Sequence, residues 1–173
     1  MSKKKLEKRL SYLYSGELSA TILFIFVSYY VDRAFPNLQL YSLYSFWISF
    51  FLLEFLLLQG TIYWYSKLKR LRIENMSMTP VWIVRLLKRL KLINIILVFV
   101  SIVMFVIDFV QFYSSLPIKG LITTVFIYIF AVLEFINYFY IQLSYDNISD
   151  IKYLLKTKKL KQSCIRKDFQ RIL

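Results

Sequence analysis

Residues 92–118 read LINIILVFVSIVMFVIDFVQFYSSLPI, and this stretch decides the fold. Asp108 is its single charged residue, and the stretch is longer than the roughly 20 residues that a helix needs to cross a bilayer core. A helix of a soluble bundle carries a polar face at a spacing of about 3.6 residues, whereas Ile95 to Ile107 has almost none. The stretch therefore predicts a membrane-spanning helix rather than a buried helix of a soluble protein.

Three further stretches of the chain have the same character. Each is long, apolar and interrupted by one acidic residue: Leu10 to Val31 by Glu17, Phe35 to Ser66 by Glu54, and Gly120 to Tyr145 by Glu134. The first apolar run is too long for a signal peptide and no small-residue cleavage site follows it, so we expect it to be retained. The sequence predicts an all-α membrane protein with four transmembrane helices.

The charged residues divide the chain into five segments. Three of them are basic: an N-terminal arm at 1–11, a loop at 67–91 and an amphipathic tail at 146–173. The other two are transmembrane hairpins. The first is at 12–66, with spans at about 12–32 and 41–65, and the second is at 92–145, with spans at about 92–113 and 121–145. Basic amphipathic juxtamembrane helices are expected in the loop and the tail. In the loop, Thr79 is predicted as an N-cap and Pro80 as the first helical residue.

The basic residues predict the orientation of the chain. It carries 23 Lys and Arg against 10 Asp and Glu, a net charge of +13, and all the cations except Arg33 and Lys119 lie in the arm, the loop and the tail. Because Lys and Arg near helix ends remain on the cytoplasmic side, we expect an integral protein of the plasma (cytoplasmic) membrane with both termini in the cytoplasm.

The same cations are candidates for contact with anionic lipid headgroups, each contributing about 1 kcal/mol near the surface. The candidates are Lys67, Lys69, Arg70, Arg85, Lys88, Arg89, Lys156, Lys158 and Lys159. Clustered cations also bind nucleic acid, but no aromatic platform or recognised module accompanies them, which disfavours that partner. Cys164 is either a reduced cytoplasmic thiol or a lipidation site.

An internal repeat is indicated at an offset of 80 residues. The shift places Leu6, Lys8, Arg9 and Leu10 on Leu86, Lys88, Arg89 and Leu90, and Leu53-Glu54-Phe55 on Leu133-Glu134-Phe135. Both copies would begin and end on the same side of the membrane. We therefore predict two tandem parallel-repeat helical hairpins, unlike the inverted repeats of many carriers.

Acidic residues inside the spans are the main functional candidates, because a charge at the bilayer centre costs about 2.5 to 3.5 kcal/mol. Glu54 and Glu134 are equivalent under the repeat, and each lies 12 or 13 residues from a charge at the cytoplasmic boundary, close to the midplane. Such a pair would share a proton or hold a cation, with Asn137 and Tyr138 as supporting groups one turn from Glu134. The alternative is that each carboxyl is protonated and joins neighbouring helices.

A weaker polar stripe follows the first and third spans at intervals of seven residues. It consists of Asn94, Ser101 and Asp108 in one copy and Tyr14, Thr21 and Ser28 in the other, with Glu17 and Asp32 on neighbouring turns. Period seven is the spacing of a packed helix seam, so packing accounts for the stripe without a ligand. Asp32 and Asp108 are expected near the outer interface, with Arg33 as a partner for Asp32.

No catalytic, metal or cofactor motif is present. The chain has no His, one Cys, no phosphate-binding loop and few Gly or Pro to break its spans, so we expect no enzyme activity, no metal and no cofactor. Three functions remain. The first is a non-catalytic interaction role, as a membrane-complex subunit, a regulator or an immunity-type protein that binds other membrane proteins or itself. The second is a small oligomeric proton- or cation-coupled transporter or channel, and the third an accessory that gathers anionic lipid.

Overall fold

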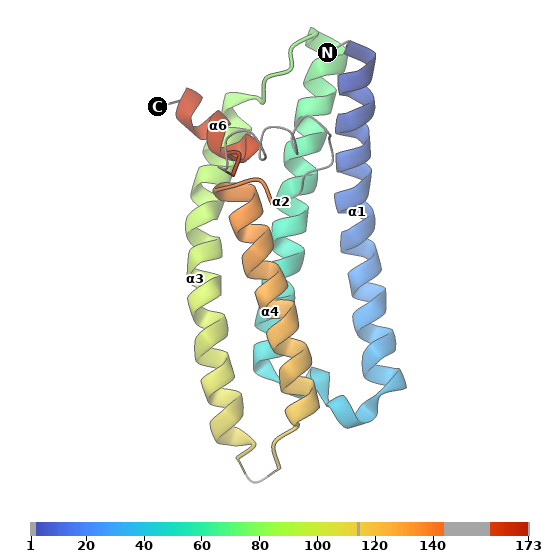
Figure 1. The fold of residues 1–173 in the computed structure, drawn as a ribbon, viewed down its shortest axis with the longest axis vertical. Helices are drawn as coiled ribbons and strands as arrows, with labels where there is room; N and C mark the ends of the chain where they lie inside the picture. Colours follow the sequence, from blue (N-terminus) through green and yellow to red (C-terminus); the bar gives the residue numbers. More distant parts are fainter. Residues whose placement is uncertain (1–2, 114, 144–159, 173) are drawn as a thin grey trace.

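The computed structural model describes residues 3–113, 115–143 and 160–172, and this part of the chain is all-helical (Figure 1). Its long helices are α1 (Lys3–Ala34), α2 (Tyr44–Glu74), α3 (Val81–Gln111) and α4 (Ile118–Phe139), followed by the short α6 (Cys164–Arg171). Two 3-10 turns, η1 (Pro36–Leu38) and η2 (Leu40–Ser42), join α1 to α2. Because all four long helices are long and apolar enough to cross a membrane, the predicted number of spans is confirmed.

The helices end where local chemistry predicts a break. Asn75 ends α2 in the left-handed conformation at φ 56°, and Pro117 precedes α4. The predicted cap of α3 is wrong. Pro80 occupies the N-cap position, whereas the hydroxyl of Thr79 is buried and donates a hydrogen bond to a carboxylate of α6.

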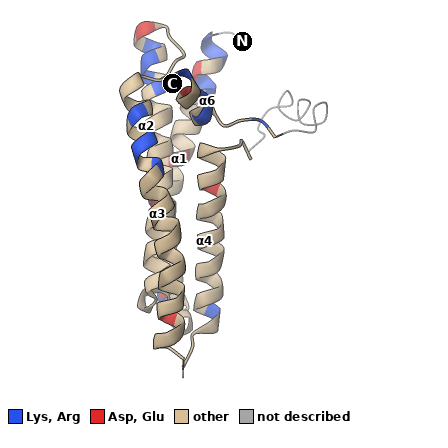
Figure 2. Cartoon of the chain, turned by 90° about the vertical axis from the view of Figure 1, so that its left-hand side faces the viewer, with Lys and Arg blue, Asp and Glu red and all other residues tan. Residues whose placement is uncertain are grey.

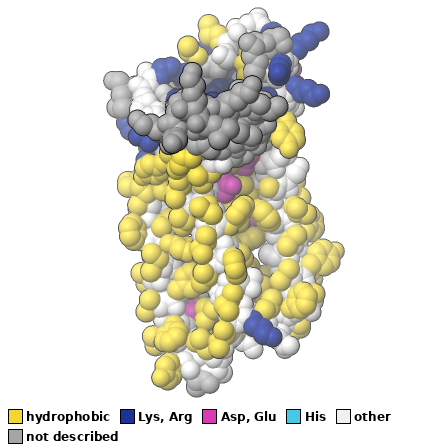
Figure 3. All heavy atoms as spheres, viewed as in Figure 1, with side chains coloured by type: hydrophobic (Ala, Val, Ile, Leu, Met, Phe, Trp, Pro, Cys, Tyr) yellow, Lys and Arg dark blue, Asp and Glu magenta, His cyan; other side chains and the backbone are white. Residues whose placement is uncertain are grey.

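Helix α2 is the centre of the fold. It packs against α1, α3 and α4, whereas α3 and α4 contact each other little (Figure 1). Leu52 and Leu56 on α2 are fully buried, while α1, α3 and α4 keep much of their apolar surface exposed. Hydrophobic side chains accordingly cover the middle of the molecule in Figure 3, as expected for a surface that faces lipid.

Lys and Arg gather at one end of the bundle, which we call the basic end (Figure 2). It contains the start of α1, the end of α2, the start of α3, and α6. Helices of 31 or 32 residues are about 47 Å long at 1.5 Å per residue, so α1, α2 and α3 exceed a hydrocarbon core of about 30 Å. The basic arm and loop are thus largely extensions of the spanning helices rather than separate amphipathic helices.

The internal repeat stays a prediction. Under the offset of 80 residues α4 is the counterpart of α2, yet α2 packs extensively against three helices and α4 packs extensively only against α2. Leu53 of α2 is buried, whereas its counterpart Leu133 of α4 is 46% exposed. Helix α4 also ends at Phe139, six residues before the expected end of the fourth span.

Candidate functional site

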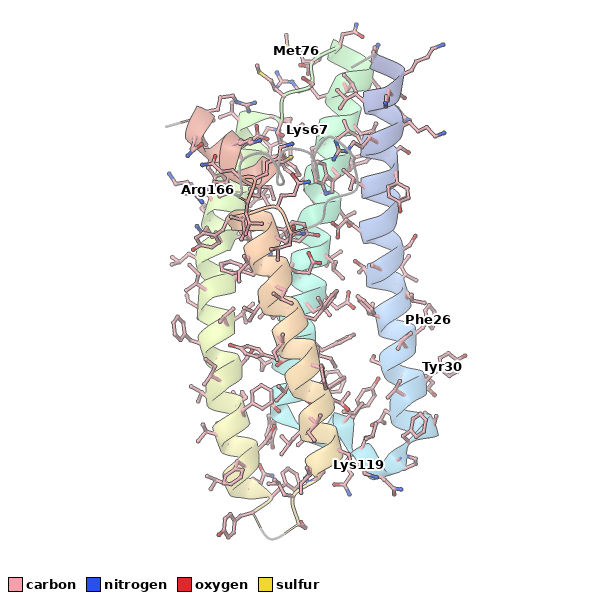
Figure 4. The ribbon with its side chains drawn as sticks, in the orientation of Figure 1. Phe26, Tyr30, Lys67, Met76, Lys119 and Arg166 are labelled. Atoms are coloured by element: carbon pink, nitrogen blue, oxygen red, sulfur yellow. The ribbon has the colours of Figure 1, made fainter. Side chains whose placement is uncertain are left out.

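A polar cavity of about 320 Å³ lies between α1, α2, α4 and α6 at the basic end. Its polar and aromatic lining includes Glu17, Trp64, Glu134, Asn137 and Tyr138, together with the cations Arg9, Lys67, Lys161 and Lys167. Arg9 precedes Glu17 by eight residues on α1, about 12 Å along the helix. The cavity is therefore acidic on its membrane side and cationic towards the basic end, where Figure 4 shows Lys67 beside α6.

A glycine brings the acidic side of the cavity together. A Cβ atom at Gly60 of α2 would overlap the hydroxyl of Tyr138 and would lie 3.2 Å from the carboxyl carbon of Glu17. No larger residue at this position leaves room for both side chains as they stand. The missing side chain of Gly60 therefore lets α1 and α4 place Glu17 and Tyr138 against the same point of α2.

Glu17 and Glu134 form the acidic pair of the cavity. The two carboxyls interact electrostatically, and Asn137 Nδ2 donates to Glu134 Oε2 at 3.2 Å. Within the described part of the chain, neither carboxyl forms a salt bridge. Tyr138 is only 5% exposed, and its hydroxyl lies against the carboxyl of Glu17 and interacts with it electrostatically.

Glu54 lies elsewhere on α2 and does not line this cavity. It is 8% exposed, and neither of its carboxyl oxygens has a hydrogen-bond partner in the described ranges. The structure thus places Glu134 and Glu17 in one cavity, and it records no interaction of Glu134 with Glu54 in those ranges. Among the acids of the spans, Glu17 and Glu134 are the ones that share a site.

The polar stripe of α3 lies in its contact with α2. Asn94 and Gln59 exchange two amide hydrogen bonds of 3.0 and 2.9 Å, and both side chains are buried. Ser101, also buried, donates to the carbonyl of Leu97 at 2.9 Å. The oxygens of Asp108 accept the backbone N–H groups of Tyr44 and Ser45 at 3.0 and 2.8 Å, which caps the N-terminus of α2 from a neighbouring helix.

Asp32 has a similar local role at the end opposite the basic end. Its Oδ1 accepts the backbone N–H of Tyr41 at 3.3 Å, which fixes the connection between α1 and α2. The neighbouring Arg33 lies over the ring of Tyr29, 5.5 Å from its centroid, and within the described ranges no salt bridge joins it to Asp32. These acids therefore serve the fold and lie outside the cavity.

A second polar cluster, missed from the sequence, attaches α6 to the basic end. Asp168 Oδ2 accepts hydrogen bonds from Tyr63 Oη at 2.8 Å and from Thr79 Oγ1 at 2.6 Å. Its carboxylate also pairs with Arg171 at 3.2 Å and, more loosely, with Lys67 at 3.9 Å. The only acidic residue in a basic helix thus joins α6 to α2 and to the α2–α3 connection.

An apolar cleft of about 480 Å³ separates α1 from α4 towards the opposite end, with α2 as its floor. Its walls include Phe24 and Val27 of α1 and Phe126 and Phe130 of α4. The rings of Phe24 and Phe130 meet edge to face, 6.1 Å between centroids. Phe24 lies seven residues after Glu17 on α1 and Phe130 lies four residues before Glu134 on α4, so the cleft continues the line of the polar cavity.

The predicted lipid contacts divide into three groups. Lys69, Arg85, Lys88 and Arg89 are exposed at the basic end, whereas Lys67 is engaged with Tyr63 and Asp168, and Arg70 pairs with Glu74 at 2.7 Å. Lys156, Lys158 and Lys159 lie outside the described residues. In Figure 4, Lys119 lies at the other end of the bundle, so the two ends differ strongly in charge.

No protein-family model, no curated protein and no solved structure matches this chain. In the described ranges, no group of three or more His, Cys, Asp or Glu side chains is placed to hold a metal ion. The polar cavity and the apolar cleft are therefore the candidate binding sites of the described part of the chain.

Proposed function

We propose that this chain is a non-catalytic integral membrane protein that acts by binding another component of the membrane, as a subunit of a complex, a regulator or an immunity-type protector. The observation that carries this proposal is the space between α1 and α4. We call the polar cavity and the apolar cleft together the α1–α4 groove. Helix α2 forms its floor, and α1 and α4 pack on α2 rather than on each other.

The lining of the groove favours binding over conduction. Its apolar part is bounded almost entirely by Phe, Leu, Val and Ile, with Ser28 and Thr123 as the polar exceptions. A path for ions needs polar groups or water along its length, and hydrocarbon leaves an ion without compensation. The polar part is confined to the basic end, which suits a groove that holds a partner from the side.

Photocrosslinking in the native membrane tests this proposal. A benzophenone amino acid at Phe126, which is 68% exposed in the cleft, should give a discrete protein adduct on illumination. The matched control is the same substitution at Phe99, which is 64% exposed on α3 and outside the groove. Equal, diffuse labelling from both positions would contradict a specific partner at the groove.

We also propose that the basic end faces the cytoplasm of a cell whose plasma membrane holds the protein. The concentration of Lys and Arg at that end supports this orientation. Cys164 is the only cysteine of the chain and is exposed on α6. A membrane-impermeant maleimide should label it only after the cells are permeabilised, and labelling of intact cells would reverse the orientation.

The parallel-repeat hairpins are part of the same proposal. Thr21 and Ser101 are equivalent under the offset of 80 residues, and both are buried. Each donates its hydroxyl to the carbonyl four residues earlier, at 3.0 and 2.9 Å. This matching bond at equivalent positions supports a common origin for α1 and α3.

A second function, a small oligomeric proton- or cation-coupled transporter or channel, is favoured by the pairing of Glu17 with Glu134. Two close carboxyls at the edge of the apolar region could share a proton or hold a cation. Reconstituted protein should then move protons or an organic cation, and replacing both residues by Gln should stop the flux. Flux that is unchanged in the double variant would exclude this function, with Glu54→Gln as the matched control.

A further inference from the structure

Among the described residues, no salt bridge pairs the acidic side of the α1–α4 groove with a cation. Neither Glu17 nor Glu134 forms an ion pair in those ranges, although four cations line the same cavity towards the basic end, namely Arg9, Lys67, Lys161 and Lys167. Uncompensated carboxyls next to an apolar region are costly, so a cation between them would be stabilised. The buried hydroxyl of Tyr138 lines the cavity against the carboxyl of Glu17, and its oxygen is an acceptor for an N–H donor.

The surroundings of these groups suit an organic cation. The indole of Trp64 lines the cavity beside the carboxyls, and an aromatic face attracts an ammonium group. A volume of about 320 Å³ admits a head group with substituents. A small metal ion, by contrast, needs several ligand oxygens in a closed shell, and no cluster of this kind occurs in the described ranges.

The apolar part of the groove accommodates what is attached to that head group. From Glu134 the lining of α4 continues with Phe130, Ile127 and Phe126 towards the opposite end. From Glu17 the lining of α1 continues with Phe24 and Val27 in the same direction. An alkyl chain extending from the carboxyls would lie in this cleft, whereas the Lys and Arg of the basic end disfavour placing the cation there.

We propose that the α1–α4 groove binds an amphiphilic organic monocation from the bilayer, with its ammonium group between Glu17 and Glu134 and its alkyl chain in the apolar cleft. This inference rests on the proposed binding role of the groove and names the chemical class of its occupant. The ligand is recognised by one positive charge at the end of one apolar chain. An uncharged amphiphile of equal length would make the same apolar contacts without the contribution of the two carboxyls.

The test uses the full chain in nanodiscs of phosphatidylcholine and a hexadecylammonium probe whose head group carries a nitroxide. A nitroxide quenches tryptophan fluorescence at short range, so Trp64 reports occupancy of the cavity once Trp47 and Trp82 are replaced by Phe. We expect saturable quenching by the cationic probe. A hexadecyl nitroxide with an uncharged head should need about tenfold more to reach half-quenching, the difference that corresponds to one retained charge interaction.

Variants separate the acidic pair from the rest of the fold. The double variant Glu17→Gln with Glu134→Gln should raise the half-quenching concentration of the cationic probe about tenfold or more. Glu54→Gln removes a buried carboxyl outside the groove and should leave the titration unchanged. The uncharged probe should titrate the parent and the double variant equally, which shows that the cleft is intact.

The inference is overturned if the cationic and uncharged probes titrate the parent protein alike, or if the double variant binds the cationic probe as the parent does. Either result leaves photocrosslinking from Phe126 unaffected, since that experiment detects a protein adduct and does not depend on the acidic pair. Conversely, absence of a crosslinked partner leaves the fluorescence titration unaffected. Failure of the inference and failure of the proposed function are thus distinguishable.

Discussion

Replacing Asp168 by Asn should release α6 from the basic end. The carboxylate of Asp168 is 11% exposed and accepts the hydroxyl protons of Tyr63 and Thr79 while pairing with Arg171. Asn has the same shape but no charge, and its single carbonyl oxygen replaces two equivalent acceptors. The substitution therefore weakens both hydroxyl bonds and the ion pair without creating a cavity.

The size of the effect follows from these contacts. A hydrogen bond to a charged group contributes about 1.5 to 3 kcal/mol, against about 1 kcal/mol for a neutral one. The side chain of Arg171 is 31% exposed, so its ion pair contributes well under the value of a buried pair. Loss of about 2 to 3 kcal/mol is expected, which raises the detached fraction of α6 roughly 30- to 150-fold. Ile165 is buried and Phe169 stacks on Phe139, so apolar contacts keep the helix mostly docked.

Hydrogen exchange of the peptide 164–171, followed by mass spectrometry in detergent micelles, measures this fraction directly. When α6 docks again faster than its amides exchange, the protection factor falls by the same factor as the equilibrium constant between docked and detached α6. The matched control is Lys167→Gln, which removes one charge from an exposed position of the same helix and should leave the protection unchanged. Equal exchange in the parent protein and in Asp168→Asn would refute the assignment of Asp168 as the residue that holds α6.

Three further substitutions test the packing of α2, each measured as the midpoint of thermal unfolding in micelles. Gly60→Ala should destabilise the fold by about 1 to 3 kcal/mol through overlap at the cavity, whereas Gly16→Ala, with nothing within 4 Å, should be neutral or stabilising by up to about 1 kcal/mol. Asn94→Leu should cost about 1 to 3 kcal/mol because it leaves the buried amide of Gln59 unpaired, and adding Gln59→Leu should restore much of the loss. Asp108→Asn should cost about 1 kcal/mol or more by weakening the cap of α2, and an unchanged midpoint would contradict the capping role.

The spans could be predicted from sequence because crossing a bilayer requires only length and apolar composition, and both are local properties. The central position of α2 could not be predicted, since all four stretches are similarly apolar. The structure indicates which feature of the sequence marks α2 as the central helix. Helix α2 buries Ser45, Ser49 and Thr61 along with Gly60, and small residues allow close approach of neighbouring helices in a membrane.

The attachment of α6 was missed for a related reason. The tail was predicted to lie on anionic lipid because its pattern alternates basic and apolar residues, and such a pattern takes no account of the single acid within Cys164–Arg171. Asp168 is that acid, and its partners Tyr63 and Thr79 are 105 and 89 residues away in sequence. A lone acidic residue on a basic amphipathic helix is the local signal that it docks on protein.

The acidic pair shows why depth alone does not identify a site. The sequence offered Glu54 and Glu134 as a candidate pair because both were placed near the midplane, with the fourth span expected to end near residue 145. Helix α4 ends at Phe139, five residues after Glu134, so this carboxyl lies about 8 Å from the end of its helix, near the level of the cavity.

Which other carboxyl Glu134 approaches then depends on the rotation of each helix about its axis. Gly60 decides that, because only a residue without a side chain allows Tyr138 and Glu17 to approach the same turn of α2. A glycine facing two polar residues of other helices is therefore better evidence for a shared site than equal depth of two acids.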